Sequence, residues 1–115
     1  MITIWHNPKC SKSRQTLELL QARGTEETIV QRRYLEDVPS PTDLRVTLAM
    51  LGLPAVAMMR TKEPLFKELG LSQESPEEEL IQAMAQNPRL IERPIVFKDK
   101  RAAIGRPPEK VLDIL

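Results

Sequence analysis

The chain has 115 residues, of which 41% are hydrophobic and 29% charged, and its 17 basic and 16 acidic residues leave a formal net charge of +1. This length fits one domain that buries roughly two-thirds of its unfolded surface, enough for a core without disulfides. The charge balance argues against nucleic acid or a membrane surface as the main partner. A single cysteine excludes an internal disulfide. Such cysteine usage suits a reducing compartment, so we expect a cytoplasmic protein.

The N-terminal stretch predicts a strand, a turn and a helix in that order. Residues 2–5 alternate and are rich in branched and aromatic side chains, which is typical of a short strand. Asn7 and Pro8 signal a turn, and the pattern becomes helical from about Ser11. Gly24 is well placed to end this helix. Because residues 28–30 predict a second strand, the chain begins with a βαβ unit.

Residues 40–88 predict several short helices. Ser40, Pro41 and Asp43 supply a cap, a proline at the first helical position and an acid in the first turn. Residues 75–78 repeat this signal as a capping box. After them, residues 95–97 predict a strand, positions 99–100 a hairpin turn into 101–104, and the end of the chain, from about 106, a helix. The order predicts an α/β fold whose mixed sheet has a βαβ start, a β-hairpin and then a helix.

Cys10 is the main candidate for chemistry, because it lies where the first helix is expected to begin. The free amides and the dipole of a helix N-terminus favour a thiolate, which is the nucleophilic form. The alternative is a buried structural cysteine, but the neighbouring Lys9, Ser11 and Lys12 make burial unexpected. In a Cys-x-x-Cys motif the second thiol would fall at Ser13. Any covalent adduct on Cys10 must therefore be released by a thiol from outside the chain.

Other polar residues could assist this thiol. As a nearby imidazolium, His6 would lower the thiol pKa, although an ordinary strand-end histidine is an equal alternative. The same helix terminus could hold an oxyanion, with Ser13 and Arg14 as additional donors. Three arginines stand at structural breaks, where each alone would be solvated. Together they could supply the bidentate donors that a tetrahedral oxyanion needs, and they are Arg60, Arg93 and Arg106.

These motifs resemble the glutaredoxin-dependent arsenate reductase family over nearly the full length. The resemblance rests on His-Asn-Pro-x-Cys-x-x-Ser-Arg at 6–14, on Arg60, on Glu-Arg-Pro-Ile-Val at 92–96 and on Gly-Arg-Pro at 105–107, and it is strongest with the YfgD-like bacterial branch. It implies one domain over residues 1–115 with a thioredoxin-like or glutaredoxin-like fold, a helical insertion at roughly 40–88, and a cis peptide bond before Pro94.

The resemblance also implies a reaction, the reduction of arsenate or a similar oxyanion. Cys10 would be the nucleophile, glutathione a co-substrate that attacks the arsenylated cysteine, and glutaredoxin the partner that completes the reduction to arsenite. The thiolate would be tuned or oriented by His6, Ser13 and Arg14. The oxyanion would be bound by Arg60, Arg93 and Arg106. We expect a monomer without a metal site or a tightly bound cofactor.

The sequence departs from the family pattern at one place, and two other functions are alternatives to this prediction. Lys9, Ser11 and Lys12 replace the small residues found around the cysteine in well-known arsenate reductases, and the lysines could strengthen or redirect anion binding. The first rival is a non-catalytic regulator that binds RNA polymerase, like the Spx proteins, although Ser13 replaces the second cysteine of their redox switch. The second is a general glutathione-linked thiol transferase, whose substrate would not require three converging arginines.

Overall fold

The computed structural model describes residues 1–23 and 27–115, which divide into two compact units. One unit consists of Met1–Asp37 and Arg93–Leu115, and the other of Val38–Glu92. The helical insertion predicted at 40–88 falls within the second unit, whereas the single domain stays a prediction. Gly24, expected to end the first helix, lies outside the described residues.

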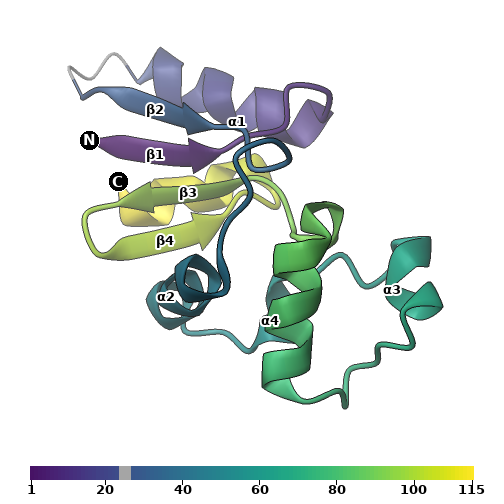
Figure 1. The fold of residues 1–115 in the computed structure, drawn as a ribbon. Helices are drawn as coiled ribbons and strands as arrows, with labels where there is room; N and C mark the ends of the chain where they lie inside the picture. Colours follow the sequence, from purple (N-terminus) through teal and green to yellow (C-terminus); the bar gives the residue numbers. More distant parts are fainter. Residues whose placement is uncertain (24–26) are drawn as a thin grey trace. The chain divides into compact units, whose positions relative to one another are not determined.

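The first unit is built on a four-stranded mixed sheet (Figure 1). Its strands follow the order β2-β1-β3-β4, with β1 (Ile2–Trp5) parallel to β2 (Ile29–Arg32) and antiparallel to β3 (Ile95–Lys98). β4 (Arg101–Ile104) pairs antiparallel with β3. Helix α1 (Ser11–Ala22) makes the crossover that parallel neighbours require. The predicted α/β class, with its βαβ start and hairpin end, is confirmed.

One face of the sheet carries the core of this unit, and α1 and the C-terminal segment pack on it (Figure 1). Ile2 and Ile4 share this face because alternate strand residues point the same way. Burying each such side chain contributes about 1.5–3 kcal/mol. The buried cluster consists of Ile2, Ile4, Leu20, Val96 and Val111. On the opposite face, the rings of Trp5 and Phe97 lie 5.0 Å apart.

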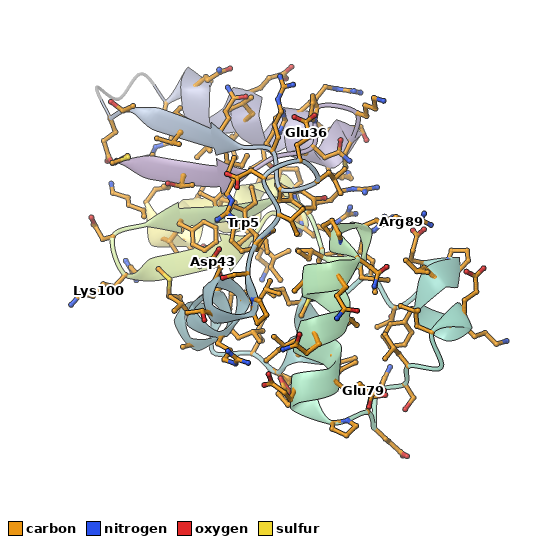
Figure 2. All side chains as sticks on the ribbon, viewed as in Figure 1. Trp5, Glu36, Asp43, Glu79, Arg89 and Lys100 are labelled. Carbon is orange, nitrogen blue, oxygen red and sulfur yellow. The ribbon has the colours of Figure 1, made fainter. Side chains whose placement is uncertain are left out.

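The hairpin and the last segment show how local chemistry shapes the chain. Asp99 has φ 55° in the β3–β4 turn, a conformation that aspartate tolerates better than most residues. Lys100 lies at the tip of this hairpin (Figure 2). The predicted final α-helix is instead a 3₁₀ helix, η3 (Pro108–Ile114). Its turns are closed by i→i+3 bonds, such as Lys110 N–H to Pro107 O at 3.0 Å, and it still buries Val111.

The second unit contains α2 (Pro41–Leu51), η1 (Ala55–Met58), α3 (Pro64–Glu68), α4 (Glu77–Gln86) and η2 (Pro88–Leu90). The predicted capping box forms at α2, where Ser40 Oγ accepts from Asp43 N–H at 3.0 Å and the Asp43 carboxylate accepts from Ser40 N–H at 3.1 Å. The one predicted at 75–78 is wrong, because Ser75 Oγ accepts from Ser72 N–H in the preceding turn. Within the described ranges, no helix has the length and apolarity needed to cross a membrane.

Candidate active site

Cys10 stands at the N-terminus of α1, at the end of a short turn that follows β1. Its backbone is extended, with φ −100° and ψ 124°, and it is the N-cap of the helix. The Cys10 N–H donates to Asn7 O at 3.0 Å, and the Cys10 carbonyl accepts from Arg14 N–H at 3.0 Å. Asn7 Oδ1 accepts from Lys9 N–H at 3.0 Å, which is the local bond that makes asparagine a turn residue. These bonds hold the sulfur at the positive end of the helix dipole.

Cys10 is 8% exposed, so the expectation that its lysine neighbours keep it unburied is wrong. Burial raises the pKa of the thiol, but the Ser13 N–H, the Arg93 guanidinium and the Lys12 N–H together lower this pKa below its ordinary value. Within the described residues, the Cys10 side chain makes no capping hydrogen bond as a neutral thiol. The Ser13 and Lys12 amides therefore stabilise the thiolate form. A lowered pKa favours the thiolate, which is the nucleophilic form of cysteine.

Arg93 is the predicted arginine that the fold brings to the thiol. β3 runs antiparallel to β1 with Ile95 opposite Trp5, so the residues before β3 lie beside the turn that follows β1. Burial lowers the pKa of Arg93, but its hydrogen bonds and charge interactions with Cys10 and with Tyr34 outweigh burial and raise it. The guanidinium and the sulfur therefore stabilise each other's charged forms.

Tyr34 is a part of the site that the sequence analysis missed. It follows β2 after Arg33 and is fully buried, and it interacts with the Arg93 guanidinium. It is the only tyrosine in the chain. A buried tyrosine hydroxyl normally has a polar partner, so the single tyrosine just beyond the strand predicted at 28–30 was the available signal. The partner itself could not be named without the fold.

Three chain segments meet closely behind Arg93. The peptide bond before Pro94 is cis, as the resemblance implies, and so is the bond before Pro107. Pro94 O accepts from Gly105 N–H at 2.8 Å. A Cβ atom on Gly105 would lie 2.9 Å from Pro94 Cγ and 2.9 Å from Thr16 Oγ1 of α1. The glycine thus lets Pro94 pack against α1, and this contact sets the position of Arg93 relative to the start of the helix.

The other two predicted arginines have different surroundings. Arg106 is exposed, and its Nε donates to Arg93 O at 2.8 Å, so these two arginines are neighbours. Arg60 belongs to the second unit, where its Nη1 lies 3.2 Å from Glu63 Oε2. Convergence of all three arginines on the thiol stays a prediction.

Ser13 joins the turn to the helix through its side chain. It is fully buried, and its Oγ accepts from Asn7 N–H at 3.0 Å and lies 2.6 Å from His6 Nδ1. The hydroxyl is therefore hydrogen-bonded to residues 6 and 7, whereas the Ser13 backbone N–H lowers the pKa of Cys10. Ser13 supports the site by fixing the loop and by presenting a backbone donor.

His6 is buried at the end of β1 and favours the neutral imidazole over the predicted imidazolium. Burial lowers its pKa, and the positive charges of Arg33 and Arg14 lower it further. With the ring neutral, we assign the Ser13 hydroxyl as donor to Nδ1, which places the ring proton on Nε2. Arg14 also donates from Nη1 to Pro8 O at 3.0 Å, which ties the helix to the turn.

The fold and the site define a class, thioredoxin-like α/β proteins with a cysteine at the N-terminus of the first helix. The chain belongs to the ArsC family, whose family model matches residues 5–114. It is 52% identical over 116 residues to the uncharacterized protein YfgD of Escherichia coli K12, covering 99% of this chain and 96% of that protein. It is 45% identical over 116 residues to a protein named arsenate reductase from Haemophilus influenzae, covering 99% and 98%.

A solved structure supports the same assignment. The structure titled arsenate reductase from Vibrio cholerae superposes with a TM-score of 0.93 at 50% identity, covering 99% of this chain and 97% of that one. At this identity the likeness extends to the sequence as well as to the fold. The predicted family and the thioredoxin-like fold are confirmed.

Proposed function

We propose that this chain reduces arsenate to arsenite, with Cys10 as the nucleophile and external thiols as the reductants. The observation that carries this proposal is the Cys10 sulfur at the N-terminus of α1 with the Arg93 guanidinium against it. That pairing supplies a thiolate and a cation to hold an oxyanion beside it. The relatives named arsenate reductase support the choice of arsenate.

In the first step, the Cys10 thiolate attacks arsenic(V). An S–As bond forms, and one arsenate oxygen takes up protons and leaves as water. The N–H groups of the first turn of α1 and the Arg93 guanidinium stabilise the remaining charged oxygens. Arg106, which lies beside Arg93, adds a second guanidinium to the oxyanion site in this proposal.

The electrons come from outside the chain, because position 13 carries a serine in place of a second thiol. The glutathione thiol displaces a second oxygen as water, so that arsenic is bonded to both Cys10 and glutathione. A glutaredoxin thiolate then attacks the glutathione sulfur. An S–S bond forms, the As–S bond to glutathione breaks, and its electron pair stays on arsenic, which becomes arsenic(III). Water hydrolyses the remaining As–S bond, which releases arsenite and restores the Cys10 thiol.

A coupled assay tests this proposal. NADPH consumption is followed with glutathione, glutathione reductase and glutaredoxin, with and without arsenate, for the wild type and for Cys10→Ser. We expect arsenate-dependent turnover in the wild type and none in the variant, whose folding is checked by thermal unfolding. Wild-type turnover no faster than the enzyme-free background would sink the proposal. A mixed-disulfide substrate and a polymerase pull-down then test the two rival functions.

The setting of the reaction is also a proposal. Glutathione would keep Cys10 reduced in the cytoplasm, and the chain would act there as a monomer without a tightly bound cofactor. Size-exclusion chromatography with light scattering at several concentrations tests the monomer. A dimer that persists at the lowest concentration would contradict it.

A further inference from the structure

The segment around the Cys10 thiol is positively charged, although the formal net charge of the chain is only +1. Residues 1–17 contain no aspartate or glutamate, but they contain Lys9, Lys12 and Arg14. All three of these residues are exposed. Lys9 precedes the cysteine in the turn, and Lys12 is the second residue of α1. A lysine therefore lies on each side of the cysteine in the chain, close to the sulfur.

The stability of α1 does not explain these lysines. The N-terminal end of a helix is positive, so a cation there is repelled and an acid would be favoured. Arg14 has a structural role, because its Nη1 donates to Pro8 O at 3.0 Å. In the described part of the chain, no ion pair joins the side chain of Lys9 or Lys12 to an acid. Both ammonium groups are thus available to an anion that approaches the thiol.

The depth of the sulfur limits which reactant the lysines can serve. In the proposed reaction, the oxyanion bonded to the sulfur is held by the amides of α1 and by Arg93. Cys10 is 8% exposed, whereas Lys9 and Lys12 are on the surface. A folded protein brings its own cysteine to such a sulfur less easily than a small, flexible thiol does. The lysines therefore suit a small anionic thiol as the second reactant.

Glutathione has the chemistry that this surface fits. It is a tripeptide with its thiol on the middle residue and a carboxylate at each end, and its net charge is negative. Three residues extend over at most about 10 Å, so both carboxylates stay close to the thiol. An ammonium group on a flexible four-carbon stem can follow a carboxylate over such distances. One lysine before Cys10 and one after it match one carboxylate on each side of the glutathione thiol.

We propose that Lys9 and Lys12 bind the two carboxylates of glutathione and thereby direct its thiol to the adduct on Cys10. This inference rests on the proposed function in one respect, because it takes glutathione as the thiol that reacts at Cys10. The family resemblance does not supply it, since small residues surround the cysteine in well-known arsenate reductases.

Thiol–disulfide exchange tests the proposal without arsenate or glutaredoxin. The Cys10 thiolate attacks one sulfur of glutathione disulfide, an S–S bond forms between Cys10 and one glutathione, and the other glutathione leaves as a thiolate. Bis(2-hydroxyethyl) disulfide undergoes the same exchange but carries no charge. Both rate constants are measured by mass spectrometry of the intact protein. Their ratio reports recognition of the carboxylates, because a change in the pKa of the thiol alters both rates together.

Lys9→Gln and Lys12→Gln should each lower the ratio about threefold, and the double variant about tenfold. A factor of three corresponds to about 0.7 kcal/mol, which is within the range of an exposed ion pair. Lys100→Gln is the matched control and should leave the ratio unchanged. Lys100 is exposed at the hairpin tip, which lies at the opposite end of the sheet from the Cys10 turn (Figure 1). In the wild type the ratio should fall as the salt concentration rises.

The proposal is overturned if the double variant keeps the wild-type ratio. Equal slowing with both disulfides has the same meaning, because the lysines would then act on the thiol itself. A rise only in the KM for glutaredoxin would also overturn it, since the surface would then bind that protein. Thermal unfolding shows that each variant is folded, as expected for exposed positions.

The outcome is independent of the arsenate assay. If arsenate is not turned over but the ratio falls in the lysine variants, the proposed reaction fails and the glutathione surface stands. If the wild type reduces arsenate while the double variant changes neither the ratio nor the KM for glutathione, the inference fails and the proposed reaction stands.

Discussion

Replacing Gly105 by alanine should destabilise the first unit and also disturb the thiol. The added Cβ would lie 2.9 Å from Pro94 Cγ and 2.9 Å from Thr16 Oγ1, whereas atoms pack best at about 3.5–4.0 Å. Neither neighbour moves easily, because Pro94 is a buried ring and Thr16 is fully buried with its hydroxyl donating to Lys12 O at 2.9 Å. Overpacking of this kind costs about 1–3 kcal/mol.

Thermal unfolding and a thiolate titration measure the two effects. For a chain of this length, a loss of 1 kcal/mol lowers Tm by about 3–6 °C. The pKa of Cys10, followed by the ultraviolet absorbance of the thiolate, should rise because displacement of Pro94 moves the Arg93 guanidinium away from the sulfur. Gly70→Ala is the control. Gly70 has φ 73° and open space around it, so alanine there costs about 1–2 kcal/mol of backbone strain and should leave the thiol titration unchanged.

A second substitution tests whether the clash is the cause. Thr16→Ala removes one of the two crowded atoms, so in the Gly105→Ala background it should restore part of the lost stability and return the thiol titration toward that of the wild type. The reasoning is refuted if Gly105→Ala unfolds at the wild-type temperature and titrates like the wild type, since the close approach would then not be what positions Arg93.

Three further predictions concern single side chains. Tyr34→Phe should raise the pKa of Cys10, because the Arg93 guanidinium that faces the sulfur is then held less firmly. An unchanged thiolate titration would contradict this prediction. His6 has a lowered pKa and is the only histidine, so the unfolded chain binds a proton below about pH 6.5 that the folded chain does not. The free energy of unfolding in urea should therefore fall as the pH drops from about 7 to 5, and a flat profile would contradict this. Ser40→Ala should cost about 1 kcal/mol of stability in urea, whereas Ser75→Ala, at the predicted box that does not form, should cost less.

Local chemistry explains why much of the framework could be predicted. The strand at 2–5, the helix that begins beside Cys10 and the cap at Ser40 each depend on residues a few positions apart. The two local errors have the same origin. The Ser75 hydroxyl is used by the turn before it, and the segment after Pro107 closes its turns with i→i+3 bonds. Several local arrangements compete at such positions, and neighbouring residues alone do not decide between them.

The surroundings of the thiol could be predicted only in part. The basic neighbours of Cys10 indicated an exposed sulfur, but Arg93 and Tyr34 come from distant parts of the chain and meet it in a buried site. The charge expected on His6 depended on how deeply it is buried and on Arg33 beside it, which its own strand does not reveal.

The sequence by itself determined the order of strands and helices, the place of the only cysteine at a helix N-terminus, and the serine at the position of a second thiol, because these follow from residue type and short spacing. Only the tertiary structure decided that Cys10 is buried with a lowered pKa and that Arg93 lies against it, because the antiparallel pairing of β3 with β1 and the close packing at Gly105 join residues that are far apart in the chain.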